Sequence, residues 1–581
     1  MFVLLPTFSV TRQVNASARQ PIIHTCVGFY VNSNKKLVIK IMKRLFMIFF
    51  SGFTVILYGQ EIQPVRPTNF IPFKYTYSVQ QLYKDYSKTI IEKARMDSIS
   101  ICEIIDRGAY KPDYSKLDLH RLPEWFKDAK FGIFYDWGLW SVAGYGQQGY
   151  HGNYYPDTYL GYMYEKGGEK MEYHQRYWGN DFERDDFIPL FSASEFNADS
   201  LARLCYESGA RYVVPFAKHM DGYCIWNNSF THRNSLRMPP HRDLLKEMYD
   251  SFRKYDIKCG FYYCLYEFEY PIIFNNRIII RNSEAANSPE ISMTGYTAFD
   301  SDFHNRIISG KIPVHDYLSQ YVVPSIKEVI DVYNPDIMWY DAEWYNTAAN
   351  NLTNVTTAYF FNKADGNKEV TVNDRLGTDS REKHGDFYTS EYNVIVENLD
   401  KYWEENRPMG NSYGYNWQDS DSSLMTAEEL IEMLVRIVAR NGNLLLMICP
   451  DATGRLPDCQ VTRLNEMGEW LKLNGEAIYG TRATSMPSEP SNTGDNVWYT
   501  QSKDGKFTYA IFFKWPSSGF MMLKNARPKW ESPMYLIGYD KPLIWYENGG
   551  SEKFIYLKLP TGMTEKNCRG KYAWVIKYEN W

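Results

Sequence analysis

The sequence predicts an α/β protein in which a (β/α)₈-like TIM barrel is followed by a C-terminal antiparallel β-sandwich. Within residues 121–480, short apolar segments alternate with segments of helical periodicity, as they do where each strand of a parallel sheet is followed by a helix. After Gly480 the helical periodicity ends. Short aromatic or β-branched segments separated by Gly, Pro, Asn and Asp follow, which is typical of a sandwich. The chain of 581 residues is also too long for one core, so two or more domains are expected.

The expected elements follow from segment length, periodicity and breaker residues. Barrel strands are expected at 130–137, 211–217, 259–265, 337–340, 369–372 and 443–448, with helices at 197–208, 242–255, 323–333 and 461–474. A further helix begins at Thr426, where Glu429 completes a capping box, and ends at Gly442. These segments form about six to seven βα units, close to a full barrel. In the sandwich, assigned to 485–581, strands are expected at 496–501, 507–513, 521–523, 553–559 and 572–578.

The N-terminal part of the chain is expected to lie outside the barrel. Residues 42–59 have a basic start, an apolar stretch and a small residue at the end, which is the pattern of a secretory signal peptide. Residues 1–41 are then interpreted as an upstream translation artefact, and 60–120 as an extension with a helix at 79–107. No Cys follows the apolar stretch, so no membrane anchor is expected. The protein is therefore predicted to be periplasmic or secreted.

Composition narrows the class of partner. The 64 basic and 69 acidic residues give a net charge of −5 without a basic stripe, so nucleic acid is not an expected partner. Aromatic residues make up 17% of the chain, and their rings with polar tips suit carbohydrate. There is no Cys-x-x-Cys pair or His spacing typical of zinc. No metal or cofactor is expected, and a homo-oligomer remains open.

The segment 334–344 carries the strongest indication of a site. Its apolar run 337–340 is typical of a strand buried on both faces of a parallel sheet, and it ends abruptly in Asp341. The carboxyl ends of barrel strands are where active sites lie. Capping of the next helix is the alternative role for Asp341. Other expected strands or the loops after them also end in polar residues, and convergence of several at one face favours a catalytic site: Asp136, His219, Asp221, Glu267, Arg375 and Glu391.

Several of these residues lie in motifs that resemble glycoside hydrolase family 29, the retaining α-L-fucosidases. The order and spacing agree from about residue 121 to 480. The motifs are WFKDAKFGIFYDWG (125–138), AKHMDG (217–222), WYD (339–341), VNDR (372–375), TSEY (389–392), SYGYN (412–416), NLLLMICP (443–450) and GEAIYGT (475–481). The resemblance implies an exo-glycosidase that hydrolyses α-L-fucosidic bonds of oligosaccharides or polysaccharides.

The resemblance also implies roles for a catalytic pair. Asp341 matches the nucleophile, and Glu391 matches the acid/base of those members that carry Glu in this context. Retaining glycosidases need two such carboxyl groups close together. The family varies in the position of the acid/base, so Glu343 and Glu404 are reserve candidates. Arg375 matches an arginine near the catalytic glutamate, with a loop-fixing salt bridge as its alternative role.

The implied sugar pocket departs from the family at one end. The rings expected to hold the methyl group of the 6-deoxy sugar are Phe134, Tyr263, Trp339 and Tyr413. At the end that reads the ring hydroxyls, His219 is kept. Asp136 and Met220 stand where the family has His, and Asn153 with Tyr154 where it has Glu-Trp. Such changes indicate either a related glycone, such as α-L-galactose or a substituted L-fucose, or only a rebuilt hydrogen-bond network. A non-catalytic glycan-binding protein on the same fold is the alternative from another class.

Overall fold

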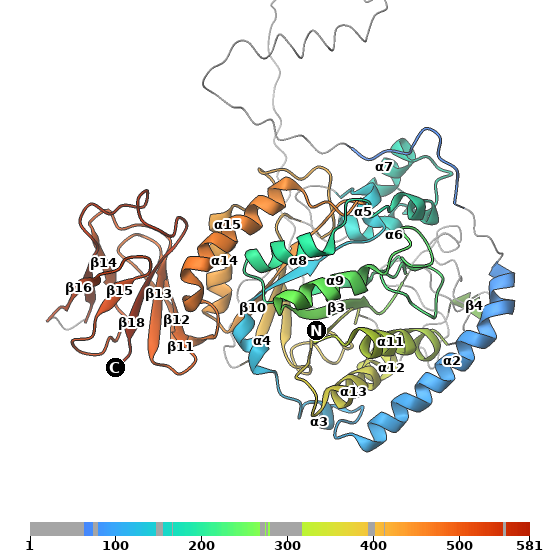
Figure 1. Ribbon diagram of the computed structural model, residues 1–581, viewed down its shortest axis with the longest axis horizontal. Coiled ribbons are helices and arrows are strands. Elements are labelled where there is room, and N and C mark those ends of the chain that lie inside the picture. Colours follow the sequence, from blue (N-terminus) through green and yellow to red (C-terminus); the bar gives the residue numbers. More distant parts are fainter. Residues whose placement is uncertain are drawn as a thin grey trace, which may run out of the picture. The chain divides into compact units, whose positions relative to one another are not determined.

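The computed structural model describes residues 63–73, 79–146, 155–165, 167–267, 273–274, 277–278, 316–344, 346–392, 401–411, 413–549 and 553–581. The expected signal peptide, 42–59, lies outside these residues, as do Asn153 and Tyr154. Among the described residues, the chain forms a curled parallel sheet and, after it, an antiparallel sheet (Figure 1). The fold class predicted from the sequence is confirmed.

The parallel sheet has eight strands among the described residues, in the order β7-β6-β3-β2-β1-β10-β9-β8. Their bounds are β1 Phe131–Tyr135, β2 Tyr212–Lys218, β3 Lys258–Cys264, β6 Ile337–Asp341, β7 Thr371–Val372, β8 Tyr388–Glu391, β9 Trp403–Pro408 and β10 Gly442–Ile448. Asn373 and Phe387 form a parallel bridge between the ends of this order, which closes the barrel. Strand order therefore follows chain order around the barrel, and all carboxyl ends meet at one face.

Helices cover the outside of the barrel (Figure 1). The main ones are α8 Ala198–Glu207, α9 Leu244–Phe252, α11 Val323–Tyr333, α13 Thr353–Ala364, α14 Ala427–Val438 and α15 Asp458–Asn474. Before and between them lie α2 Val79–Arg107, α3 Tyr114–Leu117, α4 Glu124–Ala129, α5 Trp140–Ala143, α6 Tyr159–Tyr162, α7 Glu169–Tyr177 and α12 Ala348–Asn351. The capping box predicted for α14 is present: the Glu429 amide donates to Thr426 Oγ1 at 3.2 Å, and the Thr426 amide donates to Glu429 Oε2 at 2.7 Å. Residues 373–387, between β7 and β8, contain no helix.

Strands β8 and β9 complete the barrel but were not expected from the sequence. Their residues, YTSE and WEENRP, are too polar to resemble buried strands. The structure accounts for this polarity, because β8 ends in Glu391 and β9 buries Glu404 beneath Trp339. Glu391 is thus the last residue of a barrel strand, and the expectation that it lies in a loop is corrected.

The C-terminal domain is an antiparallel sheet of eight described strands with a hydrophobic core of its own. Its strands are β11 Thr481–Pro490, β12 Asn496–Ser502, β13 Phe507–Phe512, β14 Phe520–Leu523, β15 Met534–Leu536, β16 Pro542–Glu547, β17 Ile555–Lys558 and β18 Trp574–Glu579. The indole of Trp470 in α15 donates to the Ala573 carbonyl at 2.9 Å, which ties this domain to the barrel. Within the described part of the chain, we find no helix with the length and apolar character of a membrane span.

Candidate active site

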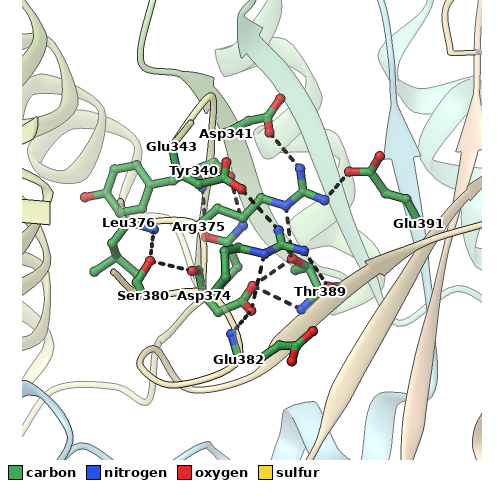
Figure 2. A network of polar contacts seen from close by, with 12 residues as sticks. Tyr340, Asp341, Glu343, Asp374, Arg375, Leu376, Ser380, Glu382, Thr389 and Glu391 are labelled. Atoms are coloured by element: carbon green, nitrogen blue, oxygen red, sulfur yellow. Dashed lines mark hydrogen bonds and ion pairs between the residues drawn. The ribbon is translucent and has the colours of Figure 1, made fainter. Parts of the chain in front are cut away.

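Asp341 ends strand β6 and is held by hydrogen bonds to both carboxylate oxygens. The Tyr262 hydroxyl donates to Oδ2 at 2.6 Å. Arg375 Nη1 donates to Oδ1 at 2.7 Å (Figure 2). Burial alone would raise the pKa of Asp341, but the Arg375 charge and these hydrogen bonds outweigh it and lower the pKa below the usual value. The side chain is still 15% exposed, so an ionised carboxylate faces the open end of the barrel.

Arg375 contacts both predicted catalytic carboxylates. Its Nη1 binds Asp341, and its Nη2 forms an ion pair with Glu391 (Figure 2). Nε donates to Thr389 Oγ1 at 3.0 Å, and the guanidinium carbon lies 4.8 Å from the centre of the Trp339 ring. One planar, buried cation therefore lies between the two carboxylates and sets how far apart they are.

The loop between β7 and β8 positions this arginine. Buried Asp374 accepts from the Thr389 amide at 3.1 Å and from Thr389 Oγ1 at 2.7 Å, so the two strand ends are joined next to Arg375. Each of the two strands that carry these carboxylates is followed by a residue in the left-handed conformation: φ is 67° at Ala342 and 55° at Tyr392. Non-glycine residues rarely adopt this conformation, and they cluster at sites where surrounding structure fixes them.

Four aromatic rings form the floor of the site: Phe134, Phe216, Tyr262 and Trp339. Ring centres are 4.7 Å apart for Phe134 and Phe216, 3.9 Å for Phe216 and Tyr262, and 5.0 Å for Phe134 and Trp339. Phe134 and Trp339 were predicted here, whereas Phe216 and Tyr262 were not. The structure places Tyr263 elsewhere: its ring lies against Trp226 and the Lys218 ammonium, on the other face of β3.

Tyr413 lies apart from this floor, among other tyrosines. Its ring packs edge-on against Tyr155, with centres 5.0 Å apart, and against Tyr392 at 5.7 Å. Its hydroxyl donates to Asn406 Oδ1 at 2.6 Å, so it already has a partner within the protein. The Tyr413 hydroxyl is therefore used by the fold.

A buried polar cluster borders the aromatic floor and contains Asp136, Asp157 and His219. Asp136 Oδ1 accepts from the Trp140 indole at 2.9 Å, and His219 Nε2 lies 3.7 Å from Asp157 Oδ2. The His219 ring lies parallel to Tyr262, with centres 5.7 Å apart. Three buried atoms of the cluster have no hydrogen-bond partner among the described residues: Asp136 Oδ2, Asp157 Oδ1 and His219 Nδ1. Such atoms are expected to bind a ligand or water.

Burial controls the charge of this cluster. It lowers the pKa of His219 to about 4, so the imidazole is neutral. It also raises the pKa of Asp136 well above the usual value and that of Asp157 to about 7. Besides burial, the negative charges of Asp341 and Glu391 contribute to the raised pKa of Asp157, whereas the positive charge of Lys170 opposes it. The cluster offers several acceptors and few fixed charges, as suits sugar hydroxyls.

Comparison with known proteins decides the family. The family model described as alpha-L-fucosidase matches residues 98–476, and that of the alpha-L-fucosidase C-terminal domain matches 491–579. The chain belongs to the α-L-fucosidase family. Plasma alpha-L-fucosidase of Homo sapiens is 32% identical over 490 residues, 82% of this chain and 94% of that protein. Alpha-L-fucosidase of Dictyostelium discoideum is 30% identical over 427 residues, 73% of this chain and 85% of that protein.

Solved structures agree with this assignment. The crystal structure of Thermotoga maritima alpha-fucosidase in complex with fucose is 28% identical, with a TM-score of 0.66, and covers 81% of this chain and 100% of that one. The resemblance inferred from the motifs is confirmed. The chain is a glycoside hydrolase of the α-L-fucosidase type, acting on fucosidic bonds.

The fucosidase holds its two reserve carboxylates in different ways. Glu404 is fully buried and accepts from the Tyr212 hydroxyl at 2.6 Å and the Trp339 indole at 2.8 Å. Glu404 therefore supports the aromatic floor from below. Glu343 is buried 3.4 Å from Arg381 Nη1, and burial raises its pKa. Glu391 is 36% exposed and reaches the solvent side, from which a leaving group must depart.

The structure also places at this site two residues, Asp157 and Tyr262, that the sequence did not indicate. No sequence pattern indicated Asp157 as a site residue, because the segment before it has neither helix nor strand periodicity. Tyr262 could have been found, because Trp339 pairs with Tyr262 in the register of β3 and β6 and paired side chains on neighbouring strands share a face of the sheet.

Met220 is half-buried against the hydrophobic core, without a described contact to the polar cluster. Among the described residues, no group of His, Cys, Asp and Glu side chains could hold a metal.

Proposed function

We propose that the protein is an exported, retaining exo-α-L-fucosidase that uses Asp341 as nucleophile and Glu391 as acid/base. The observation that carries this proposal is the shared cation: one buried guanidinium contacts both carboxylates through its two terminal nitrogens. Two carboxylates on one guanidinium are close, as in retaining glycosidases, where the carboxyl groups are about 5 Å apart. An inverting enzyme needs a wider gap that admits water between them.

In the first step, Asp341 attacks the anomeric carbon while Glu391 protonates the departing glycosidic oxygen. The lowered pKa of Asp341 suits a group that must be ionised to attack. The glycosyl–Asp341 ester that forms removes one negative charge from beside Arg375. Having protonated the departing oxygen, Glu391 is left as a carboxylate, and Arg375 forms an ion pair with it. This carboxylate is the base that activates water in the second step, so a single cation serves both half-reactions.

The aromatic end of the pocket supports L-fucose over L-galactose as the glycone. L-galactose carries a hydroxyl on C6 where L-fucose has only a methyl group. The polar atoms at this end already have protein partners: the Tyr262 hydroxyl binds Asp341, and the Trp339 indole binds Glu404. A 6-hydroxyl would be buried without a free partner, at a cost of about 1–3 kcal/mol. A methyl group needs none.

The opposite end supports recognition of an unsubstituted terminal sugar. The three unpartnered atoms of Asp136, Asp157 and His219 are acceptors or a neutral imidazole nitrogen, all buried. Ring hydroxyls donate to such atoms, and the burial leaves little room for a bulky substituent. We therefore favour terminal L-fucose over an O-substituted fucose. A purely glycan-binding role is disfavoured because Asp341, Glu391 and Arg375 keep the arrangement that catalysis needs.

Export is proposed from the signal-like segment 42–59, with a periplasmic or secreted destination and fucosylated oligosaccharides or polysaccharides as substrates. Fractionation of cells expressing the full chain, with N-terminal sequencing of the product, tests this part. An exported product that begins near Gln60 is the expected result. A full-length protein confined to the cytoplasm would contradict it.

The catalytic proposal is tested by the product first formed. Hydrolysis of 4-nitrophenyl α-L-fucoside is followed by ¹H NMR before mutarotation equilibrates the anomers. The proposal predicts that α-L-fucose appears first, and that 4-nitrophenyl α-L-galactoside is cleaved with a kcat/KM at least tenfold lower. If β-L-fucose appears first, the mechanism is inverting and the assigned roles are wrong.

A further inference from the structure

The C-terminal domain contains a tryptophan-lined pocket with a volume of about 260 Å³. It lies between the end of strands β16 and β17 and the segment 526–530. We call it the Trp pocket, and its principal residues are Arg527, Trp530, Trp545, Glu547, Lys553 and Trp581. All belong to the C-terminal domain, so the Trp pocket is distinct from the catalytic site in the barrel.

Two of its indoles are unusually exposed. Trp530 is 63% exposed and Trp581 is 87% exposed, although large apolar side chains normally avoid water. Trp545 forms the inner wall: its ring is half-buried, its indole donates to the Ser532 carbonyl at 3.0 Å, and Trp530 packs edge-on against it with centres 6.3 Å apart. A fixed ring and an exposed ring thus meet nearly at right angles. Exposed aromatic surfaces of this kind mark binding sites.

The alternation of β16 explains why the pocket exists. Leu543, Trp545 and Glu547 lie on one face of the strand, and Ile544 and Tyr546 on the other. Leu543 is buried in the core of the domain, Trp545 is half-buried and Glu547 is exposed. Burial on this face of β16 therefore decreases from Leu543 to Glu547, and the Trp pocket lies at the exposed end of the strand.

Charged groups of both signs stand at the rim. Glu547 and Lys553 form an ion pair at 3.0 Å. Arg527 Nη1 donates to the carbonyls of Lys524 and Ala526 at 2.7 and 2.8 Å, which fixes the guanidinium in place. The rim carries two cations, Arg527 and Lys553, and one anion, Glu547. Both cations already have partners within the domain, because Lys553 pairs with Glu547 and Arg527 binds backbone carbonyls. Such a rim suits a neutral, hydroxyl-rich ligand better than a phosphate or a nucleic acid.

We propose that the Trp pocket is a non-catalytic binding site for a sugar unit of a polysaccharide or glycan. A pyranose presents C–H faces that stack on indole rings and hydroxyls that bond with the charged rim. Because the barrel cleaves fucosidic bonds, binding here would raise the local concentration of a polymeric substrate without affecting a small one.

The test uses the full chain with Asp341→Asn, so that no turnover alters the probe. Affinity electrophoresis through gels containing porcine gastric mucin, fucoidan or xyloglucan measures retardation by each polymer. We expect at least one polymer to retard the protein, and Trp530→Ala to weaken that retardation about tenfold or more. Tyr546→Ala is the matched control, because Tyr546 is 52% exposed on the opposite face of the same strand. It should leave retardation unchanged.

A second readout separates this site from catalysis. In the otherwise native enzyme, Trp530→Ala should leave kcat/KM for 4-nitrophenyl α-L-fucoside unchanged and lower the rate of fucose release from the retarding polymer. Failure of the small substrate to react would contradict the proposed catalytic function only, since retardation needs no turnover. Absence of retardation by all three polymers, or equal retardation of the Trp530→Ala and Tyr546→Ala variants, would overturn the Trp pocket proposal. So would a change of oligomeric mass in Trp530→Ala with unchanged retardation, which would identify the pocket as a contact between copies.

Discussion

Arg375 is the residue that links the two catalytic assignments. Its buried guanidinium keeps Asp341 ionised and binds Glu391 at the same time. Replacement by Lys would keep a positive charge but lose the planar fork that spans both carboxylates. At the residue scale, the account therefore depends on geometry as well as on charge.

The first prediction concerns the identity of the acid/base. Glu391→Ala should slow a fucoside with a poor leaving group by about 10²–10⁴-fold, because only such a substrate needs protonation of the departing oxygen. An activated aryl fucoside should be affected far less. Glu343→Ala is the control, since Glu343 is buried near the same arginine and has a raised pKa. The assignment fails if the leaving-group dependence appears in Glu343→Ala and is missing from Glu391→Ala.

The second prediction concerns Asp157, which the sequence did not indicate. Asp157→Asn keeps the size of the side chain but replaces one acceptor oxygen by a donor. If Asp157 accepts a hydrogen bond from a ring hydroxyl, kcat/KM for 4-nitrophenyl α-L-fucoside should fall about 10- to 100-fold. The reaction of the variant with an analogue lacking the contacted hydroxyl should be nearly unchanged. An equal loss for both substrates would show that Asp157 acts only on the fold.

At the scale of elements, the register of β3 decides which tyrosine belongs to the site. Tyr262 pairs with Trp339, and Tyr263 pairs with Tyr340. Neighbouring side chains of a strand point to opposite faces of the sheet, so an error of one residue in matching the motif selects a tyrosine on the wrong face. The match by resemblance selected Tyr263. Buried apolar strands such as β6 and β10 were predictable from the sequence because their side chains are uniformly apolar. Strands β8 and β9 were not, because they carry polar residues such as Glu391 and Glu404 where a buried strand is usually apolar.

The third prediction follows from this register. Tyr262→Phe removes the hydrogen bond that lowers the pKa of Asp341, so kcat/KM should fall about tenfold and its acidic limb should move to higher pH. Tyr263→Phe is the matched control on the opposite face of the strand, and its pH profile should resemble that of the wild type. A shift of the acidic limb in Tyr263→Phe, with none in Tyr262→Phe, would contradict the register.

For the whole molecule, sequence patterns predicted the barrel followed by a sandwich, and the motifs predicted the family. They did so because periodicity and strand-end motifs are local properties of the chain. The polar cluster was not predictable in this way, since Asp136, Asp157 and His219 meet only when segments distant in the sequence fold together. The departures from the family at Asp136 suggested an altered glycone, whereas the structure provides another buried carboxylate, Asp157, beside His219.

The fourth prediction concerns global stability and pH. Burial raises the pKa of Glu404 to about 7, above its usual value. Between about pH 4.5 and 7, the unfolded state has lost this proton and the folded state has kept it, so Glu404 makes stability fall as pH rises. In Glu404→Gln this contribution is absent. Denaturant unfolding at pH 5 and pH 7.5 should therefore show a smaller decrease for the variant than for the wild type, whereas an equal decrease would mean that Glu404 titrates normally.

Formation of a glycosyl ester on Asp341 is the central claim, and direct labelling tests it. The wild-type enzyme is incubated with 2-deoxy-2-fluoro-α-L-fucosyl fluoride, whose C2 fluorine slows both steps while its good leaving group favours accumulation of the intermediate. Mass spectrometry of the intact protein and of its proteolytic peptides then locates the adduct. We predict one fluorofucosyl group, on Asp341, and none in Asp341→Asn. An adduct on Glu343, Glu391 or Glu404 would contradict the account.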